Sequence, residues 1–439
     1  MSAKNSEQFR SVVRNGMCNR CGSCVGLSNG QIRFDNKEGR YLPRIVGTPD
    51  EETMKLVLSA CSGRAFNFPA QRERLFGDTP SHVYTGAFRS LHIGYAENQQ
   101  IRSQAASGGI LSAMLIYLLR NKHIAGAVVL GMSKEKPWLT APFIATTEEE
   151  ILEAAQSKYI LSSVNEILPE IGAFDGKLAY VGLPGQVQSI RLLQQQGHPW
   201  VKNIEYIFGP FYGNTLHFSS IKSFLRSHGE KDYQQIKQLY FRYGEWPGNM
   251  RVEMKNGKAY QLKKFHANYL IPFHIVKNSL ICTDLANEFT DVSGGDAWAP
   301  VYEERGKGFS MILARSEKGE ALIRQMQADG WLNLTPIDLE TSITMHSHGY
   351  DLKKRGSFIR MSWMRLVGMK TPDYGYRLSG FGLSRYLMEA VIDLLFLVLG
   401  TWPARRAVEL LPPTLIGNLF EKSRIFWKKS TKNIKRQNL

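Results

Sequence analysis

Hydrophobic and polar positions along the chain follow two periods, and the change between them marks two kinds of structure. From about residue 88 to residue 235, short apolar runs alternate with segments in which apolar residues recur every three or four positions, as expected of strands followed by helices. Beyond residue 235 apolar and polar residues alternate instead, and Asn256-Gly257 is typical of a hairpin turn. Buried strands are predicted at residues 126–131, 177–182, 204–208 and 309–314. The pattern therefore predicts an α/β fold.

Helix signals lie between the predicted strands. Apolar residues from Ile110 to Leu119 share one helical face. Thr147 and Glu150 form a capping box, which predicts that a helix begins there. Further helices are expected after Pro184 and near residues 219–227 and 317–327.

The first 80 residues differ from the rest of the chain because they hold few long periodic segments and four of the five cysteines. We expect a small segment held together by a cofactor there, rather than a self-sufficient core. Behind it we expect an α/β body in two parts and a helical, basic C-terminal tail. The boundaries that the sequence suggests are 1–80, 81–235, 236–379 and 380–439.

The composition narrows the class of protein. Of the 439 residues 43% are hydrophobic and 21% are charged, which excludes a mainly disordered chain. Five cysteines are too few for a secreted disulfide scaffold. Residues 1–16 lack the apolar core of a signal peptide, and no uncharged apolar stretch is long enough to predict a transmembrane helix. We therefore expect a reduced, cytoplasmic protein.

The C-terminal end combines an apolar run with a concentration of positive charge. Residues 421–439 hold seven Lys or Arg and one Glu, within a chain whose net charge is +16. Before them, the apolar run from Tyr386 to Trp402 is interrupted by Glu389 and Asp393. On a helix these two carboxylates share one face and leave a broad apolar face opposite.

Two interpretations of this end remain open. We favour one in which the apolar face packs on the α/β body and the basic tail is solvated. The alternative is an amphipathic helix with a polybasic anchor, making weak peripheral contact with the inner face of an anionic membrane. Nucleic acid is not an expected partner, because no nucleic-acid motif accompanies the charge.

The cysteines form a pattern that favours an iron–sulfur cluster. Cys18, Cys21 and Cys24 make a C-x2-C-x2-C motif, and three such thiolates on one loop can reach three corners of a cubane. Gly22 inside the motif tolerates the positive φ that a loop wrapping a cluster requires. Cys61 is the candidate fourth ligand. A structural zinc site and free cysteines remain the alternatives.

Glycine-rich loops follow the predicted strands and are candidates for ligand binding. Ser107, Gly108 and Gly109 precede an apolar helix whose first N–H groups can hold a phosphate or pyrophosphate. Ligands collect at the carboxyl ends of strands in open α/β sheets, so the loops together predict a cleft. Each loop is also a common turn, and the spacing is not G-x-G-x-x-G, so an ordinary Rossmann nucleotide site is not supported. The other loops are Gly182–Gly185 with Pro184, Gly209–Gly213, and Gly294–Trp298 with Gly295 and Asp296.

The ordered set of motifs, from about Cys18 to about Ala328, resembles one known family. The motifs read C-N-R-C-G-S-C, C-S-G, S-Q-A-A-S-G-G-I-L, S-K-Y, Y-V-G-L-P-G-Q-V, F-R-Y-G-E-W-P-G-N-M, L-I-C-T-D-L-A-N-E-F-T-D-V-S-G-G-D-A-W and G-K-G-F-S. They are similar to those of the coenzyme F420 hydrogenase/dehydrogenase β-subunit family. Its members reduce coenzyme F420, chlorophyll intermediates or unidentified substrates.

The resemblance implies an N-terminal [4Fe–4S] segment and an α/β body that binds FAD. Electrons are then expected to pass between the cluster, the flavin and a second carrier or substrate. Lys158, in S-K-Y, becomes a candidate cation near the flavin or its phosphates. The alternative for Lys158 is a solvated lysine at a helix end.

The chain also departs from the family pattern. Many relatives carry cysteines at four further positions, where this chain has Gly185, Tyr212, Ser279 and Cys282, so three of the four lack a thiol. A second cluster is therefore not expected, and Cys282 is interpreted as a buried structural cysteine.

The function that we expect is a flavin-dependent iron–sulfur oxidoreductase. It would take electrons from a ferredoxin-like donor or a reduced deazaflavin and pass them to an unidentified small-molecule acceptor. The basic surface favours an acidic ferredoxin. The alternative is a non-enzymatic electron-transfer or adaptor subunit of a larger assembly. Three residues are candidate proton donors, and nothing in the sequence ranks them: Tyr212, His217 and Tyr243.

Overall fold

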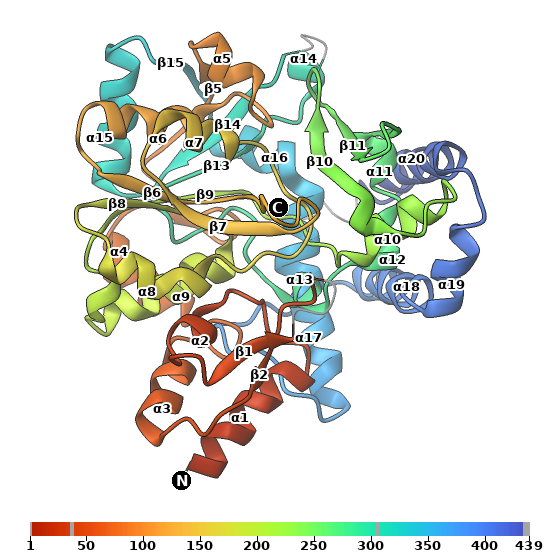
Figure 1. Cartoon of the computed structure of the whole chain (residues 1–439), viewed down its shortest axis with the longest axis horizontal. Coiled ribbons are helices and arrows are strands. Elements are labelled where there is room, and N and C mark those ends of the chain that lie inside the picture. Colours follow the sequence, from red (N-terminus) through yellow and green to blue (C-terminus); the bar gives the residue numbers. More distant parts are fainter. Residues whose placement is uncertain (1, 36–38, 304–306, 433–439) are drawn as a thin grey trace.

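A mixed eight-stranded sheet forms the centre of the molecule (Figure 1). The structure is a computed structural model that describes residues 2–35, 39–303 and 307–432. The strand order is β15-β5-β14-β13-β9-β8-β6-β7. Four adjacent strands, β13, β9, β8 and β6, run parallel. Antiparallel pairing adds β14, β5 and β15 on one side and β7 on the other. The strands are β5 (Ser90–Ala96), β6 (Gly126–Met132), β7 (Thr140–Ala145), β8 (Leu178–Val181), β9 (Ile204–Pro210), β13 (Val292–Asp296), β14 (Ser310–Ala314) and β15 (Leu332–Pro336).

Helices cover both faces of this sheet, which explains why its central strands are continuous apolar runs (Figure 1). Neighbouring residues of β6 show the effect, because Val128 belongs to one hydrophobic core and Val129 to the other. The predicted α/β class is therefore confirmed, as are the predicted strands and the capping box of Thr147 and Glu150. One face carries α5 (Gln99–Ser103), α6 (Ile110–Arg120), α7 (Glu148–Glu153) and α15 (Glu317–Ala328); the other carries α4 (Phe68–Phe76), α8 (Leu168–Ala173) and α9 (Pro184–Gln195).

The N-terminal segment lies below the sheet in Figure 1 and packs against the loop before α8. Gly22 shows how close the approach is, since a Cβ there would come within 2.3 Å of the Ser163 Oγ and 2.5 Å of the Glu166 amide nitrogen. Its φ of +99° is also one that favours glycine. The elements are α1 (Ser2–Arg14), α2 (Ser23–Gly26), β1 (Ile32–Asp35), β2 (Leu42–Ile45), α3 (Glu51–Ser59), and the facing 3-10 turn η2 (Val164–Ile167).

A second, three-stranded antiparallel sheet packs against short helices beside the large sheet. Residues 250–254 alternate between buried and partly exposed, and the expected Asn256-Gly257 hairpin joins two of its strands. Because β13, β14 and β15 lie in the large sheet, residues 236–379 contribute to both sheets. The elements are β10 (Ile236–Tyr243), β11 (Asn249–Met254), β12 (Ala259–Lys263), α10 (Ser219–Arg226), α11 (Lys264–Ala267), α12 (Leu270–His274) and α13 (Lys277–Ile281).

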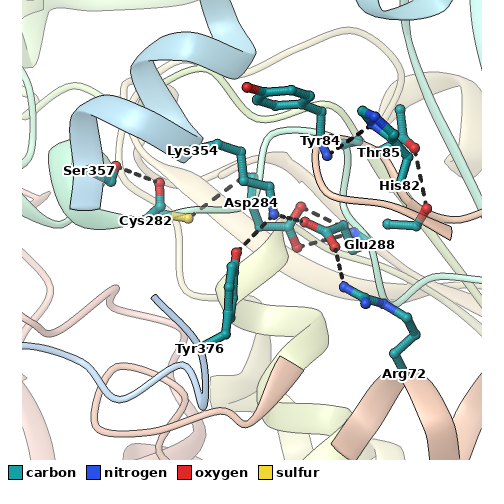
Figure 2. Close-up of polar contacts among 12 residues, drawn as sticks. Arg72, His82, Tyr84, Thr85, Cys282, Asp284, Glu288, Lys354, Ser357 and Tyr376 are labelled. Carbon is teal, nitrogen blue, oxygen red and sulfur yellow. Dashed lines mark hydrogen bonds and ion pairs between the residues drawn. The ribbon is translucent and has the colours of Figure 1, made fainter. Parts of the chain in front are cut away.

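A long helical segment with a π-helical turn buries a run of charged residues against the body. It comprises α16 (Leu339–Tyr350), the turn η5 (Asp351–Gly356) and α17 (Ser357–Leu366). Figure 2 shows Lys354 of η5 beside the Glu288 carboxylate, to which its Nζ donates, while the Tyr376 hydroxyl accepts from the same Nζ at 3.0 Å. Glu288 and Lys354 side chains are each 1% exposed. Asp284 accepts the Glu288 N–H at 3.1 Å, and burial raises the pKa of Asp284 to about 7.

The orientation of the C-terminal apolar helix contradicts the interpretation that we favoured. The helix exists, as α18 (Leu383–Leu399), and is followed by α19 (Trp402–Val408) and α20 (Pro413–Ser430). Its charged face, not its apolar face, packs on the body: Glu389 is fully buried and pairs with Arg360 and Arg385. The reason is electrostatic, because both guanidinium groups are buried and require an anion.

In the described part of the chain no single helix is long and apolar enough to cross a membrane. Taken together, α18 and α19 are long and apolar enough, but the two helices are bent by 78° relative to one another. Of the seven predicted basic residues of the tail, Lys435 and Arg436 lie outside the described residues.

We predict that Lys354→Met destabilises the protein strongly. It leaves the buried Glu288 carboxylate with only the more distant, partly exposed Arg72 guanidinium, 3.8 Å away, as a cationic partner. Breaking a buried ion pair in this way typically costs about 3–5 kcal/mol. Urea unfolding followed by circular dichroism measures the free energy of unfolding. The double variant Lys354→Met/Glu288→Met should recover most of the loss, because neither charge is then buried alone. Equal destabilisation in single and double variants would show that the pair is not the source of the effect.

Candidate functional site

A cavity of about 530 Å³ lies at the edge of the large sheet where the parallel strands end. It contains the loops that follow β8 and β9, the end of β13 and the start of α6. The volume lies within the range of about 300–1,000 Å³ that is common for cofactor and ligand sites. The lining segments are 105–107, 109–112, 154–159, 181–183, 210–216 and 294–296.

The structure brings six of the eight predicted flavin-site residues to this cavity. They are Ser107, Gly109, Lys158, Gly182, Gly295 and Asp296. The first turn of α6, from Ile110 to Ser112, also lines it, and amides in a first helical turn have no acceptor within their own helix. Whether these residues bind a flavin stays a prediction.

Two predicted residues lie behind the lining. Gly108 is buried, and its N–H donates to the Ser310 Oγ at 2.9 Å. This N–H is therefore not free to bind a ligand, contrary to our expectation. A Cβ at this position would meet the Gly94 carbonyl oxygen at 2.5 Å. The glycine is therefore required by packing between chain segments, and a larger residue there would disturb the fold. Pro184 is the first residue of α9 and is buried too.

Arg242 organises one wall of the cavity, and sequence analysis did not select it. Its buried guanidinium donates to the Asp296 carboxylate at 3.1 and 3.4 Å and to the Tyr159 hydroxyl at 3.0 Å. It also donates to the carbonyl groups of Pro247, at 2.6 Å, and Ala106. Asp296, predicted as a ligand acceptor, thus has a protein partner and acts first as the counterion of Arg242. An arginine within the apolar strand motif F-R-Y was the available signal, because a buried charge requires a partner.

Lys158 lines the cavity but does not behave as a solvated lysine. Its Nζ donates to the carbonyl groups of Ala154, Ala155 and Gln156 at 2.5, 2.7 and 3.2 Å, at the end of α7. Burial lowers the pKa of Lys158 to about 7. The side chain is therefore balanced between its neutral and charged forms near neutral pH.

Aromatic side chains and a second lysine complete this part of the cavity. The Lys264 Nζ lies 5.1 Å from the centre of the Trp298 ring and 5.5 Å from that of Tyr159. Burial alone would raise the pKa of Tyr159, but the charges of Lys264 and Arg242 lower it. His346 lies at the wall with one ring nitrogen 3.0 Å from the Asp296 carbonyl oxygen, and burial lowers its pKa to about 4.

Of the three candidate proton donors only Tyr212 lines the cavity. Burial raises the pKa of Tyr212 to about 12, and its hydroxyl lies 2.6 Å from the Ser279 Oγ. Burial lowers the pKa of His217 to about 4, and neither His217 nor Tyr243 belongs to the lining.

The four predicted cluster ligands lie close enough together to influence one another. The pKa of Cys24 is raised well above its usual range, first by burial and then by the charges of Cys21, Cys18 and Cys61. Burial and the same neighbouring thiols raise the pKa of Cys61 to about 12. Within the described residues no three His, Cys, Asp or Glu side chains form a site for a single metal ion. A cubane differs from one ion in that each thiolate binds a separate iron atom.

The cysteine loop and the cavity share a wall. The backbone N–H of Asn165 donates to the backbone carbonyl of Cys21 at 2.8 Å, and the side-chain Nδ2 of Asn165 donates to the backbone carbonyl of Gln186 at 3.1 Å. Gln186 in turn lines the cavity. One buried asparagine therefore bridges the two predicted cofactor sites.

Gly185, Tyr212, Ser279 and Cys282, the four positions at which the chain departs from or keeps the expected cysteine pattern, also lie near this wall. Tyr212 and Ser279 are joined by the 2.6 Å hydrogen bond. Gly185 lies against Asn19, whose Nδ2 would be 2.3 Å from a Cβ there. Cys282 is buried, in accord with a structural cysteine.

Comparison with known proteins gives distant but extensive similarities. The coenzyme F420-dependent sulfite reductase of Methanocaldococcus jannaschii is 25% identical over 391 residues, which make up 84% of this chain and 54% of that protein. The coenzyme F420 hydrogenase subunit beta of Methanococcus voltae is 28% identical over 263 residues, 58% of this chain and 86% of that one. The chain thus spans about half the length of the first relative and most of the second.

A solved structure shows the same fold. A chain from the F420-reducing [NiFe] hydrogenase complex of Methanosarcina barkeri matches with a TM-score of 0.52 and 21% identity, covering 65% of this chain and 96% of that one. Residues 91–169 match the family described as coenzyme F420 hydrogenase/dehydrogenase, beta subunit N-term, and residues 175–340 match the corresponding C terminus. These regions cover more than half of the sequence, and the chain belongs to the coenzyme F420 hydrogenase/dehydrogenase beta-subunit family.

Proposed function

We propose that this chain is a flavin-dependent iron–sulfur oxidoreductase, with FAD in the cavity and one [4Fe–4S] cluster on the cysteine loop. The observation that carries the proposal is the shared wall, in which Asn165 joins Cys21 to Gln186. When bound, the cluster supplies single-electron chemistry and the flavin supplies hydride chemistry. Sites on two sides of one wall suit electron transfer between such groups.

The cavity residues fit a dinucleotide with a pyrophosphate and an aromatic ring. The first turn of α6 offers amide donors from Ile110 to Ser112, and a helix N-terminus favours an anion. Lys158 and Lys264 bring positive charge to the lining, and Trp298 brings an aromatic face. Arg242 holds Asp296 and Tyr159 in place and neutralises the carboxylate.

The cysteine residues fit a cluster because they are unfavourable as four isolated thiolates. Burial and mutual repulsion raise the pKa values of Cys18, Cys24 and Cys61, so a bound cation is needed to stabilise their charged forms. Cys18, Cys21, Cys24 and Cys61 would be the ligands. Gly22 and Gly63 allow the loops to approach, since a Cβ at Gly63 would lie 2.7 Å from the Met17 carbonyl oxygen.

The names of the relatives point to the redox partner. Several are named for coenzyme F420, including a hydrogenase beta subunit and a sulfite reductase. We therefore propose a reduced deazaflavin or a ferredoxin-like protein as donor, and a small molecule as acceptor. Relatives that are subunits of complexes also favour partner subunits.

A second candidate function is that of an electron-transfer or adaptor subunit without its own substrate. It is favoured by relatives that act as beta subunits rather than as whole enzymes. The two functions differ in one measurement, the oxidation of reduced coenzyme F420 by the isolated chain with an artificial electron acceptor. Turnover favours the oxidoreductase, whereas bound cofactors without turnover favour the adaptor.

We predict that protein purified without oxygen contains iron, sulfide and releasable FAD. Cys61→Ala should lower the iron content or convert the cluster to a three-iron form, because one ligand is lost, while FAD remains. Iron and sulfide analysis with electron paramagnetic resonance measures this. Cys282→Ala is the matched control, since it removes a buried thiol outside the proposed ligand set. Full iron in Cys61→Ala together with loss in Cys282→Ala would overturn the ligand assignment.

We also predict that FAD binding weakens as the pH rises from 6 to 9. The pKa of Lys158 is about 7 in the free protein, and a bound pyrophosphate should raise it, so binding takes up a proton and is lost as Lys158 deprotonates. Lys158→Met should bind FAD about tenfold more weakly at pH 6 and show a flat profile, because a positive charge near the pyrophosphate is lost. The three N–H donors of Lys158 already bond carbonyl groups, so the effect is that of the charge and not of a lost hydrogen bond.

Fluorescence titration of cofactor-depleted protein with FAD checks this prediction. Lys177→Met is the control, because Lys177 pairs with Glu205 outside the cavity lining and should keep the wild-type profile. Identical profiles in wild type and Lys158→Met would leave Lys158 only the role of bonding the carbonyl groups at the end of α7.

A further inference from the structure

The helix α18 turns an apolar stripe away from the body. Leu387, Val391, Leu394 and Val398 follow one another at intervals of four, three and four residues, so they lie along a single line on the helix. Their exposed fractions are 60%, 47%, 58% and 52%. Leu395 and Leu397 flank the stripe and are 49% and 72% exposed.

This arrangement is the reverse of a helix docked on a soluble body, which normally buries its apolar stripe. The buried side instead carries an ion-pair network, in which Glu389 pairs with Arg360 and, at 2.6 Å, with Arg385. Arg385 also pairs with Asp351 of η5 at 2.8 Å. The network fixes the rotation of α18, so its apolar side cannot turn inward without breaking buried ion pairs.

Exposed apolar residues continue along the two helices that follow. Trp402, at the break between α18 and α19, is 69% exposed. On α20 the exposed fractions of Leu415, Leu419 and Phe426 are 49%, 53% and 71%. Figure 1 shows the three helices together at one side of the molecule, beside the three-stranded sheet.

The charges of these helices favour one class of partner. Between residues 383 and 432 all of the exposed charged residues are basic, namely Arg406, Lys422, Lys428, Lys429 and Lys432. Three of the four acidic residues in this span have partners, since Glu389 pairs with Arg385, Glu409 with Arg226, and Glu421 with His266 at 3.2 Å. The fourth, Asp393, is only partly exposed. An apolar surface surrounded by positive charge is complementary to an anionic lipid bilayer.

We propose that α18, α19 and α20 form a membrane-contact surface that lies in the headgroup region of an anionic bilayer. The helix α18 lies on the membrane rather than across it, because its 17 residues span roughly 25 Å at about 1.5 Å per residue, against about 30 Å for the hydrocarbon core. Its first half is also clamped to the body through Glu389. Trp402 at the bend suits the interface, where an amphipathic ring is favoured.

This surface goes beyond the proposed redox function, because it places the reaction at a membrane. It is independent of the cofactors, since none of its exposed apolar residues lines the cavity.

Flotation of the full chain with vesicles tests the proposal. Wild-type protein should float with phosphatidylglycerol-containing vesicles, much less with pure phosphatidylcholine, and less at high salt. The variant Leu387→Gln/Leu394→Gln/Val398→Gln should bind anionic vesicles at least about tenfold more weakly, because apolar area buried in the bilayer is lost. Lys422→Gln/Lys428→Gln/Lys429→Gln should bind anionic vesicles about ten- to a hundredfold more weakly and lose most of the salt dependence, because each lysine near the surface contributes up to about 1 kcal/mol.

A matched control replaces Leu366 and Val367 with Gln, because these residues are 83% and 74% exposed at the end of α17, away from the proposed surface. This variant should float like the wild type. Light scattering after gel filtration tests for a second copy on the surface. Wild type that fails to float, a triple leucine–valine variant that floats normally, or a dimer that this variant converts to monomer without any vesicle binding would overturn the proposal.

Discussion

The buried ion pair between Glu288 and Lys354 is the constraint on which the rest of the structure depends. A charge out of water is tolerated only when its partner is held in place, so each residue fixes the element that carries the other. Lys354 belongs to the π-helical turn and Glu288 to the segment before β13. The neighbouring Asn287 is fixed as a result, and its Nδ2 donates to the carbonyl groups of Gly182 at 2.8 Å and Pro210 at 3.2 Å. The ends of β8 and β9, and with them the cavity, are thus positioned by a salt bridge outside it.

Electrostatics also gives the two proposed cofactor sites opposite requirements. Around the cavity Arg242 is balanced by Asp296, and Lys158 and Lys264 leave an excess of positive charge suited to an anionic ligand. Around the cysteine loop the thiolates would repel one another, so a cationic group is needed there. The two environments lie on either side of Asn165, which is fully buried and uncharged.

The sequence was sufficient for features that depend on neighbouring residues. Strand β6 was predictable because both of its faces are buried, which makes the run continuously apolar, and the Thr147 cap and the Asn256-Gly257 turn are local signals. Features that depend on distant partners could not be predicted. The inward face of α18 was decided by Arg360, which lies on another helix 29 residues before Glu389, and the role of Gly108 by Ser310. Arg242 meets Asp296 only once two sheets are assembled, and periodicity contains no information on that pairing.

The strand order has a consequence for how the protein is made. Strand β5, at Ser90–Ala96, pairs on one side with β14 and on the other with β15, so both of its neighbours come from the last third of the chain. On a ribosome that adds about 5–20 residues per second, β5 waits on the order of ten to fifty seconds for them. During that interval both of its edges lack their native partners, although α5 and α6 can already pack on one face. Such unpaired edges invite pairing with other chains. The early part of the sheet is therefore the part of this fold most open to pairing with other chains until its late strands arrive.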